Sequence, residues 1–209
     1  PEPRGHEIFI SLRDMGRQLL PGVEMTADRE VFQELTLLLD RLVLRALSES
    51  RLVQGSVGIN LNVDSLLTPE FERIAQRLYD RDGAALWVDL DIPDILANFE
   101  TFRDARLVLR RFGVRTMAES TRPELVPTAE QRDLGLEGYK FIYPDDPDAL
   151  NHMSGTLRRI REAERLAILT RVERDEAITV GQRLGVHHFQ GFYINDLLSG
   201  FAERPVERE

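Results

Sequence analysis

Short apolar runs alternate along the chain with longer segments in which apolar residues recur at helical spacing. Apolar or alternating runs of about four to eight residues, bounded by turn-forming residues, predict strands. Seven such runs occur, at residues 6–12, 56–63, 84–90, 114–119, 139–143, 166–172 and 187–190. The pattern therefore predicts a protein built on repeated short strands.

The segments between these runs have the periodicity of helices. Helical spacing occurs at residues 28–49, 68–79, 92–112, 146–163 and 174–184, while 123–134, with two prolines, is a short helix or a loop. Thr68-Pro69-Glu70 has the residues of a helix start: a cap, a proline at the first position and an acid behind it. Strand–helix alternation favours a parallel sheet with helical crossovers. An open doubly wound sheet and a βα barrel both fit, although a barrel needs eight strands.

Composition narrows the class of protein. The chain has 209 residues, 42% hydrophobic and 30% charged, which is enough for one core, so we expect one domain over 1–209. A net charge of −9 disfavours a nucleic-acid polymer as a partner. The chain has no cysteine, which excludes disulfides and thiolate chemistry. No apolar run approaches the roughly 20 residues of a membrane span, and no signal peptide is visible. We expect a cytoplasmic protein, or the cytoplasmic part of a larger one.

The last predicted strand runs into Gln190-Gly191-Phe192-Tyr193. Glycine lets the backbone turn where a larger residue would clash, and a glutamine side chain carries both donors and an acceptor. Functional sites of repeated βα folds lie at the carboxyl ends of the strands. Gln190 is therefore a candidate ligand-binding residue.

This closing stretch resembles the closing signature of EAL domains, the bacterial cyclic-di-GMP phosphodiesterase family. Further segments resemble the family's motifs in the same order. Residues 6–11 resemble its Glu-Ala-Leu strand, 58–62 its Val-Asn-Leu-Ser and 88–91 its Glu-Ile-Thr-Glu, while 116–120, 139–143 and 169–173 stand at its Ala-Leu-Asp-Asp-Phe, Leu-Lys-Ile-Asp and Ala-Glu-Gly-Val-Glu. The resemblance implies an α/β fold, a TIM-like (βα) barrel of EAL type, whose opening Gln-Pro-Ile strand has no counterpart in this chain.

In the family, two divalent cations held by carboxylates and an asparagine activate water to cleave the phosphodiester. The matching positions here are Glu7, Asn60, Asp91, Glu119, Ser120, Phe141, Thr170 and Glu173. Glu7 and Asn60 keep the family residue. Asp91 is one methylene too short and Glu119 one too long, and each change moves a carboxylate by about 1.5 Å where magnesium tolerates a few tenths of an ångström.

The remaining substitutions remove charge. Ser120 replaces an aspartate, Thr170 replaces a glutamate, and Phe141 replaces the lysine that would orient water or stabilise the transition state. Lys140 is adjacent, but strand alternation predicts that it points to the opposite face. Because the members of a catalytic unit act together, we predict no phosphodiesterase activity, no metal centre and no cofactor.

Loss of catalysis leaves ligand binding open. Ser11 occupies the position of an arginine that helps the family to hold the dinucleotide, which weakens the case for recognition. The candidate residues of a vestigial groove are Glu7, Asn60, Asp91, Glu119 and Gln190. Structural roles are also open for several of them: an ion pair for Glu7, backbone hydrogen bonds for Asn60 and a strand cap for Gln190.

The favoured function is a non-catalytic EAL-like signalling module, either a cyclic-di-GMP receptor or a regulatory adaptor that signals to a protein partner. The resemblance implies motility, attachment and biofilm control as its field, and it is compatible with a homodimer. One alternative is a protein–protein interaction domain that no longer binds cyclic di-GMP. The others are an active phosphodiesterase with a rearranged metal site and an unrelated βα-barrel enzyme.

Overall fold

The fold is a parallel sheet whose strands follow one another in sequence order. The computed structural model describes residues 5–10, 15, 28–49, 55–81, 85–144, 149 and 152–203. The strands are β1 (His6–Ile8), β2 (Val57–Asn60), β3 (Leu86–Leu90), β4 (Arg115–Ala118), β5 (Gly138–Ile142), β6 (Leu166–Thr170) and β7 (His188–Phe189), paired in the order β1 to β7. Every pairing with a described register is parallel. The seven predicted strands and the parallel sheet are thus confirmed.

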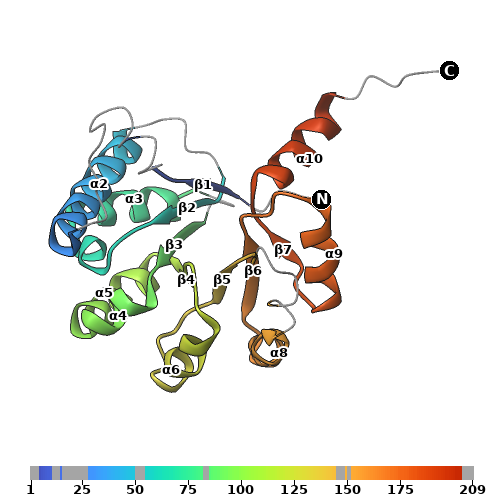
Figure 1. The fold of residues 1–209 in the computed structure, drawn as a ribbon. Helices are drawn as coiled ribbons and strands as arrows, with labels where there is room; N and C mark the ends of the chain where they lie inside the picture. Colours follow the sequence, from blue (N-terminus) through green and yellow to red (C-terminus); the bar gives the residue numbers. More distant parts are fainter. Residues whose placement is uncertain are drawn as a thin grey trace. The chain divides into compact units, whose positions relative to one another are not determined.

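Helical segments connect the strands (Figure 1). They are α2 (Arg29–Glu49), η1 (Val63–Leu67), α3 (Pro69–Tyr79), α4 (Ile92–Ala97), α5 (Phe99–Arg111), η2 (Pro123–Leu125), α6 (Val126–Gln131), α8 (Ser154–Glu162), α9 (Asp175–Arg183) and α10 (Phe192–Glu203). The helix predicted over 92–112 divides at Asn98, and that predicted over 146–163 lies partly outside the described residues. The sequence pattern missed α10. Within the described residues, no helix is long and apolar enough to cross a membrane.

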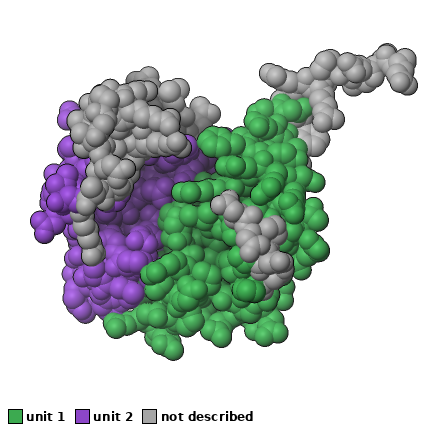
Figure 2. All heavy atoms as spheres, in the orientation of Figure 1, with its two compact units in different colours: residues 1–3, 117–209 green, residues 4–116 purple. Residues whose placement is uncertain are grey.

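The described residues fall into two compact units, and the boundary lies inside β4 (Figure 2). We call the unit that extends to Thr116, purple in Figure 2, the first unit, and the unit that begins at Met117, green in Figure 2, the second unit. The core of the first contains the fully buried Ile59, Phe71 and Phe102. The core of the second is built from apolar residues of its strands and helices, among them Met117, Phe141, Ile160, Leu169 and Val186.

The start of α3 has the capping geometry that the sequence predicts. Thr68 has extended backbone, and its hydroxyl oxygen accepts a hydrogen bond of 3.3 Å from the Phe71 N–H. Pro69 is the first helical residue, where its missing N–H costs nothing. The helix then buries Phe71, Ile74 and Leu78 in the core of the first unit, which fixes its inner face.

A buried carboxylate fixes the loop that leaves β2. One oxygen of Asp40, on α2, accepts hydrogen bonds from the backbone N–H and side-chain amide of Asn62, each 2.8 Å, and from the Ser65 hydroxyl at 2.7 Å. Asp94, on α4, accepts a further bond of 2.7 Å from the Val63 N–H. Buried polar groups need such partners, so this network holds the segment that follows Asn60 in one conformation.

Burial raises the pKa of the Asp40 carboxyl above its ordinary value, and the hydrogen bonds from Asn62 and Ser65 lower it by less. A carboxyl with a raised pKa in the folded state stabilises the fold most below its unfolded pKa, and this contribution is lost as the pH rises through the folded value. Asp40 therefore favours folding less at neutral pH than in weak acid.

We predict that Asp40→Asn, which keeps a carbonyl oxygen for the three donors, gains stability relative to the native chain as the pH rises from about 4 to 7. Urea unfolding at a series of pH values measures this difference. Asp40→Ala, the matched control, loses the acceptor and should be less stable than Asp40→Asn by about 2–4 kcal/mol at every pH. A constant difference between Asp40→Asn and the native chain over this range would contradict the prediction.

Candidate functional site

Polar side chains of the first unit gather on the face of β1, β2 and β3 that is turned away from the apolar residues of β2. Asn60 donates a side-chain hydrogen bond of 3.1 Å to the Glu7 carboxylate. In the strand register, Asn60 lies opposite Asp89 and Glu7 lies opposite Gly58. A Cβ at Gly58 would meet Glu7 Cγ at 3.8 Å and Asp89 Oδ2 at 3.9 Å. These residues therefore form a small acidic cluster, which we call the Glu7–Asn60–Asp89 cluster.

Asp89 is a residue that sequence reasoning missed. It is 2% exposed and lies within β3, whereas Asp91 is exposed and follows the strand as the residue before α4. The match to the Glu-Ile-Thr-Glu motif placed Asp91 at the ligand position, but the strand partner of Asn60 is Asp89. Strand alternation from the Asn60 pairing was the signal that could have found it.

In the second unit, Glu119 is held by two neighbours. One oxygen of its carboxylate accepts a hydrogen bond of 3.2 Å from the Ser120 hydroxyl, and the other lies 3.4 Å from the ammonium of Lys140. The Lys140 side chain is 6% exposed, and Lys140 is the chain's only lysine. Ser120 adopts φ 44, in the left-handed region that non-glycine residues rarely occupy. We call this group the Glu119–Lys140 pair with Ser120.

The position of Lys140 corrects the sequence prediction that it points away from the candidate residues. Lys140 contacts Glu119, while Phe141 is 1% exposed and its ring stacks on that of Tyr139, 6.4 Å away. The prediction that Lys140 and Phe141 point to opposite faces of β5 was right. The residue on the same face as Glu119, however, is Lys140 and not Phe141. Lys140 is therefore the basic residue of β5 that contacts a candidate site residue.

Thr170, at the end of β6, has a hydroxyl that is already used. It is 5% exposed and donates a hydrogen bond of 3.3 Å to the Phe141 carbonyl on β5. Arg171 follows at φ 56, where the resembling motif has a glycine. Thr170 is thus a neutral group that links the ends of β5 and β6. Glu173, three residues later in the chain, is exposed.

The Gln190-Gly191 motif lies directly after β7 and packs on the backbone that follows β6. The Gln190 N–H donates to the Leu169 carbonyl at 2.9 Å, and its carbonyl accepts from the Val172 N–H at 3.0 Å. A Cβ at Gly191 would lie 2.3 Å from the Val172 carbonyl oxygen, so only glycine fits there. Phe192, the next residue, begins α10 and is 71% exposed.

Two further points concern the site. Ser11, the residue at the arginine position, lies outside the described residues. Among them, no three His, Cys, Asp or Glu side chains lie close enough together to hold a metal ion. In the second unit, the carboxylate of Glu119 with the Lys140 ammonium and the Ser120 hydroxyl is not, by itself, a ligand set that fits a divalent cation.

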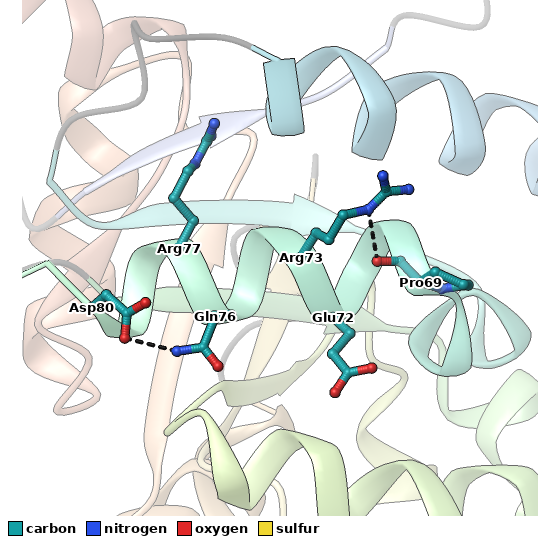
Figure 3. A pocket seen from close by; sticks show the side chains of 6 residues that line it. All are labelled: Pro69, Glu72, Arg73, Gln76, Arg77 and Asp80. Atoms are coloured by element: carbon teal, nitrogen blue, oxygen red, sulfur yellow. Dashed lines mark hydrogen bonds between the residues drawn. The ribbon is translucent and has the colours of Figure 1, made fainter.

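A groove also runs along the outer surface of α3 (Figure 3). Its walls are polar side chains bonded within the helix: Arg73 to the Pro69 carbonyl at 3.2 Å, and Gln76 to Asp80 at 2.7 Å. Arg77, which also lines the groove, donates to the carbonyls of Leu47 and Ser48 near the end of α2. None of the sequence-predicted site residues lines this groove, so we do not place the functional site there.

The strand order, the helical connections and the polar clusters at strand ends define a parallel fold of the βα-barrel class. More particularly, it is the TIM-like fold of EAL domains. The FimX EAL domain of Xanthomonas citri, solved with c-diGMP, superposes with a TM-score of 0.66 at 14% identity over 92% of this chain and 81% of that one. The FimX EAL domain of Pseudomonas aeruginosa gives 0.58 at 17% identity over 77% of this chain and 70% of that one.

A second group of solved structures is longer than this chain. Vibrio cholerae LapD, comprising an S helix, GGDEF and EAL parts, gives a TM-score of 0.61 at 16% identity. Klebsiella pneumoniae BlrP1, solved with manganese and cy-diGMP, gives 0.57 at 16% identity. The match spans 45% of each of these longer chains. It covers 82% of this chain for LapD and 80% for BlrP1. No family model and no curated protein sequence matches the chain.

We predict that Gly191→Ala destabilises the protein by more than about 2 kcal/mol, because the added methyl would overlap the Val172 backbone. Urea unfolding measures the loss. Gly200→Ala is the matched control: it lies in α10 with nothing within 4 Å of the added Cβ, and should be neutral or stabilising by up to about 1 kcal/mol. Equal effects of the two substitutions would show that the close approach at Gly191 is unimportant.

Proposed function

We propose that the chain is a non-catalytic EAL-like signalling module that binds cyclic di-GMP without metal and reports its occupancy to a protein partner. The proposal takes residues 1–209 as one EAL-like domain. The candidate ligand-binding residues are Glu7, Asn60, Asp91, Glu119 and Gln190, to which Asp89 and Lys140 are added. A cytoplasmic location and a role in motility or biofilm control belong to the same proposal.

The observation that carries the proposal is the charge balance around Glu119. The glutamate is countered by the Lys140 ammonium at 3.4 Å and by a neutral hydroxyl at Ser120, while Thr170 is neutral and already bonded to the Phe141 carbonyl. A divalent cation needs several anionic oxygens at fixed distances. A group of one anion and one cation has no such excess of negative charge, so it favours function without metal.

The choice of ligand is supported by the structural neighbours. Both FimX EAL domains were solved with c-di-GMP, and so was one form of LapD. The second unit has groups that suit a ligand with phosphates and amide-bearing bases: an ammonium at Lys140 for charge, and a side-chain amide at Gln190 for a base edge. The likeness in fold and this donor set are the two supports.

Lys140 also favours a second candidate, an active phosphodiesterase with a rearranged metal site. The lysine that could orient water or stabilise the transition state is present beside Glu119. Ser120 and Thr170 oppose this candidate, because each replaces an acid of the resembling motif and cannot contribute a charged ligand. A third candidate is the interaction domain that no longer binds nucleotide. It would have the same fold, but its ammonium and amide groups would not bind a nucleotide.

Isothermal titration with cyclic di-GMP tests these candidates. We expect binding in the micromolar range, with the same affinity in magnesium and in excess chelator, and no hydrolysis product on ion-exchange chromatography. Gln190→Ala should weaken binding by about tenfold or more, because it removes hydrogen bonds to a charged ligand. Gln182→Ala, on the exposed face of α9, is the matched control and should leave binding unchanged.

Each outcome of the titration separates two candidates. Cleavage at enzyme-like rates with manganese or magnesium would replace the proposal by the phosphodiesterase. No heat change at millimolar nucleotide, with a folded protein by circular dichroism, would support the interaction domain.

Restoring the acids provides an independent prediction. The double variant Ser120→Asp with Thr170→Glu should gain manganese-dependent thermal stabilisation, because it adds two anionic groups, one next to Glu119 and one at the end of β6. Its neutral control, Ser120→Asn with Thr170→Gln, has nearly the same shape and should show no shift. Thermal unfolding with manganese and with chelator measures the gain. An equal manganese shift in the native chain would mean that the substitutions did not remove a metal site.

A further inference from the structure

The outer face of α2 carries apolar side chains that the protein leaves in solvent. Val31, Leu38 and Leu42 are 62%, 51% and 54% exposed, and Leu35 between them is half-buried. At about 100° per residue these four positions lie within a narrow stripe along the helix. Leucine side chains in such a row, on a helix of 21 residues, form a continuous apolar surface rather than scattered exposed residues. We call it the α2 stripe.

The opposite face of the same helix is already occupied. Leu44, Leu47 and Asp40 are 0%, 7% and 7% exposed, and they lie about 180° around the helix from the stripe. Asp40 is bonded to the loop before α3, and Arg77 of α3 donates to the carbonyl of Leu47. The helix is therefore anchored on one side, and its stripe is not needed to hold it in the first unit.

The stripe has the spacing of a helix–helix seam. Its members follow one another at steps of four, three and four residues, which is the a/d spacing of a coiled coil. Glu34 and Arg41 are both exposed, and both lie along the same edge of the stripe, about two helical turns apart. Arg45 extends that edge and pairs with Glu49 at 3.2 Å within the helix. The charges on this border are thus a glutamate toward the start and arginines toward the end.

This order of charges selects an antiparallel partner. If two α2 helices lie antiparallel about a two-fold axis near the middle of the stripe, Glu34 of each copy lies close to Arg41 of the other, and the pairing occurs twice. In a parallel pair, the same border positions face apolar residues of the other helix, and no such complementarity arises. The stripe is therefore complementary to itself in one orientation.

We propose that the α2 stripe is a homodimer interface, in which a second copy of this chain docks its own α2 antiparallel to the first. The inference does not rest on the proposed nucleotide function. Four apolar residues per helix bury well under the roughly 1,200 Å² of a standard interface, so the dimer is weak and forms at tens of micromolar or above. Such a dimer would respond to local concentration, for example when the chain is tethered to a longer protein.

Sedimentation velocity of the native chain from about 5 µM to 1 mM tests the proposal. We expect a reversible monomer–dimer equilibrium. Leu38→Glu should abolish the dimer by placing a charge in the seam, while circular dichroism stays native because the position is 51% exposed. Leu107→Glu is the matched control: Leu107 is an exposed leucine on α5, 71% exposed and outside the stripe, and its substitution should leave the equilibrium unchanged.

Charge exchange identifies the partner and its orientation. E34R brings like charges together and should weaken the dimer at least fivefold, whereas E34R combined with R41E should restore it. A monomer at 1 mM would overturn the proposal, and so would a dimer that is unaffected by Leu38→Glu. Weakening by E34R without restoration in the double variant would overturn the antiparallel arrangement and, with it, the proposed interface.

Discussion

Parallel strand pairing is the constraint on which the candidate residues depend. Each strand must be followed by a helical crossover, so the chain can change function-bearing side chains at strand ends without disturbing the helices. Within a strand, one face is taken by the core: Val57 and Ile59 are 2% and 0% exposed, which leaves Gly58 and Asn60 on the other face. The same alternation in β5 buries Phe141 and turns Lys140 to Glu119. Core packing therefore decides which polar residues can meet.

The substitutions in the second unit are coherent when they are considered as a change of charge. An aspartate beside Glu119 would add an anion, whereas Ser120 donates a hydrogen bond of 3.2 Å to it. A buried glutamate at position 170 would carry a large desolvation cost without a cation, whereas Thr170 satisfies its hydroxyl on the neighbouring strand. The buried lysine lies 3.4 Å from Glu119 and offsets its charge.

Strands and crossovers could be predicted from the sequence because periodicity and end signals, such as Thr68-Pro69, are local. The errors arose where one residue of register mattered. Matching motifs by similarity selected Asp91 and put Phe141 at the lysine position, whereas the pairing of Asn60 with Asp89 and the contact of Lys140 with Glu119 are set by strand neighbours distant in sequence. The role of Asp40 was likewise invisible, because its donors lie on a loop more than twenty residues away. Composition alone also cannot tell which leucines of α2 stay exposed.

Asp40 connects the two faces of the first unit that carry proposals. Its carboxylate holds the backbone N–H of Asn62, two residues beyond Asn60, and Asn60 in turn donates to Glu7. A shift of α2 along its axis would have to stretch these bonds or move the end of β2 with it, because buried polar groups need such partners. If a ligand at Asn60 and a second copy on the α2 stripe prefer different positions of α2, each must weaken the other by the same factor; if they prefer the same position, each must strengthen the other equally. The helix is thus the element through which assembly and ligand binding would be coupled in this unit.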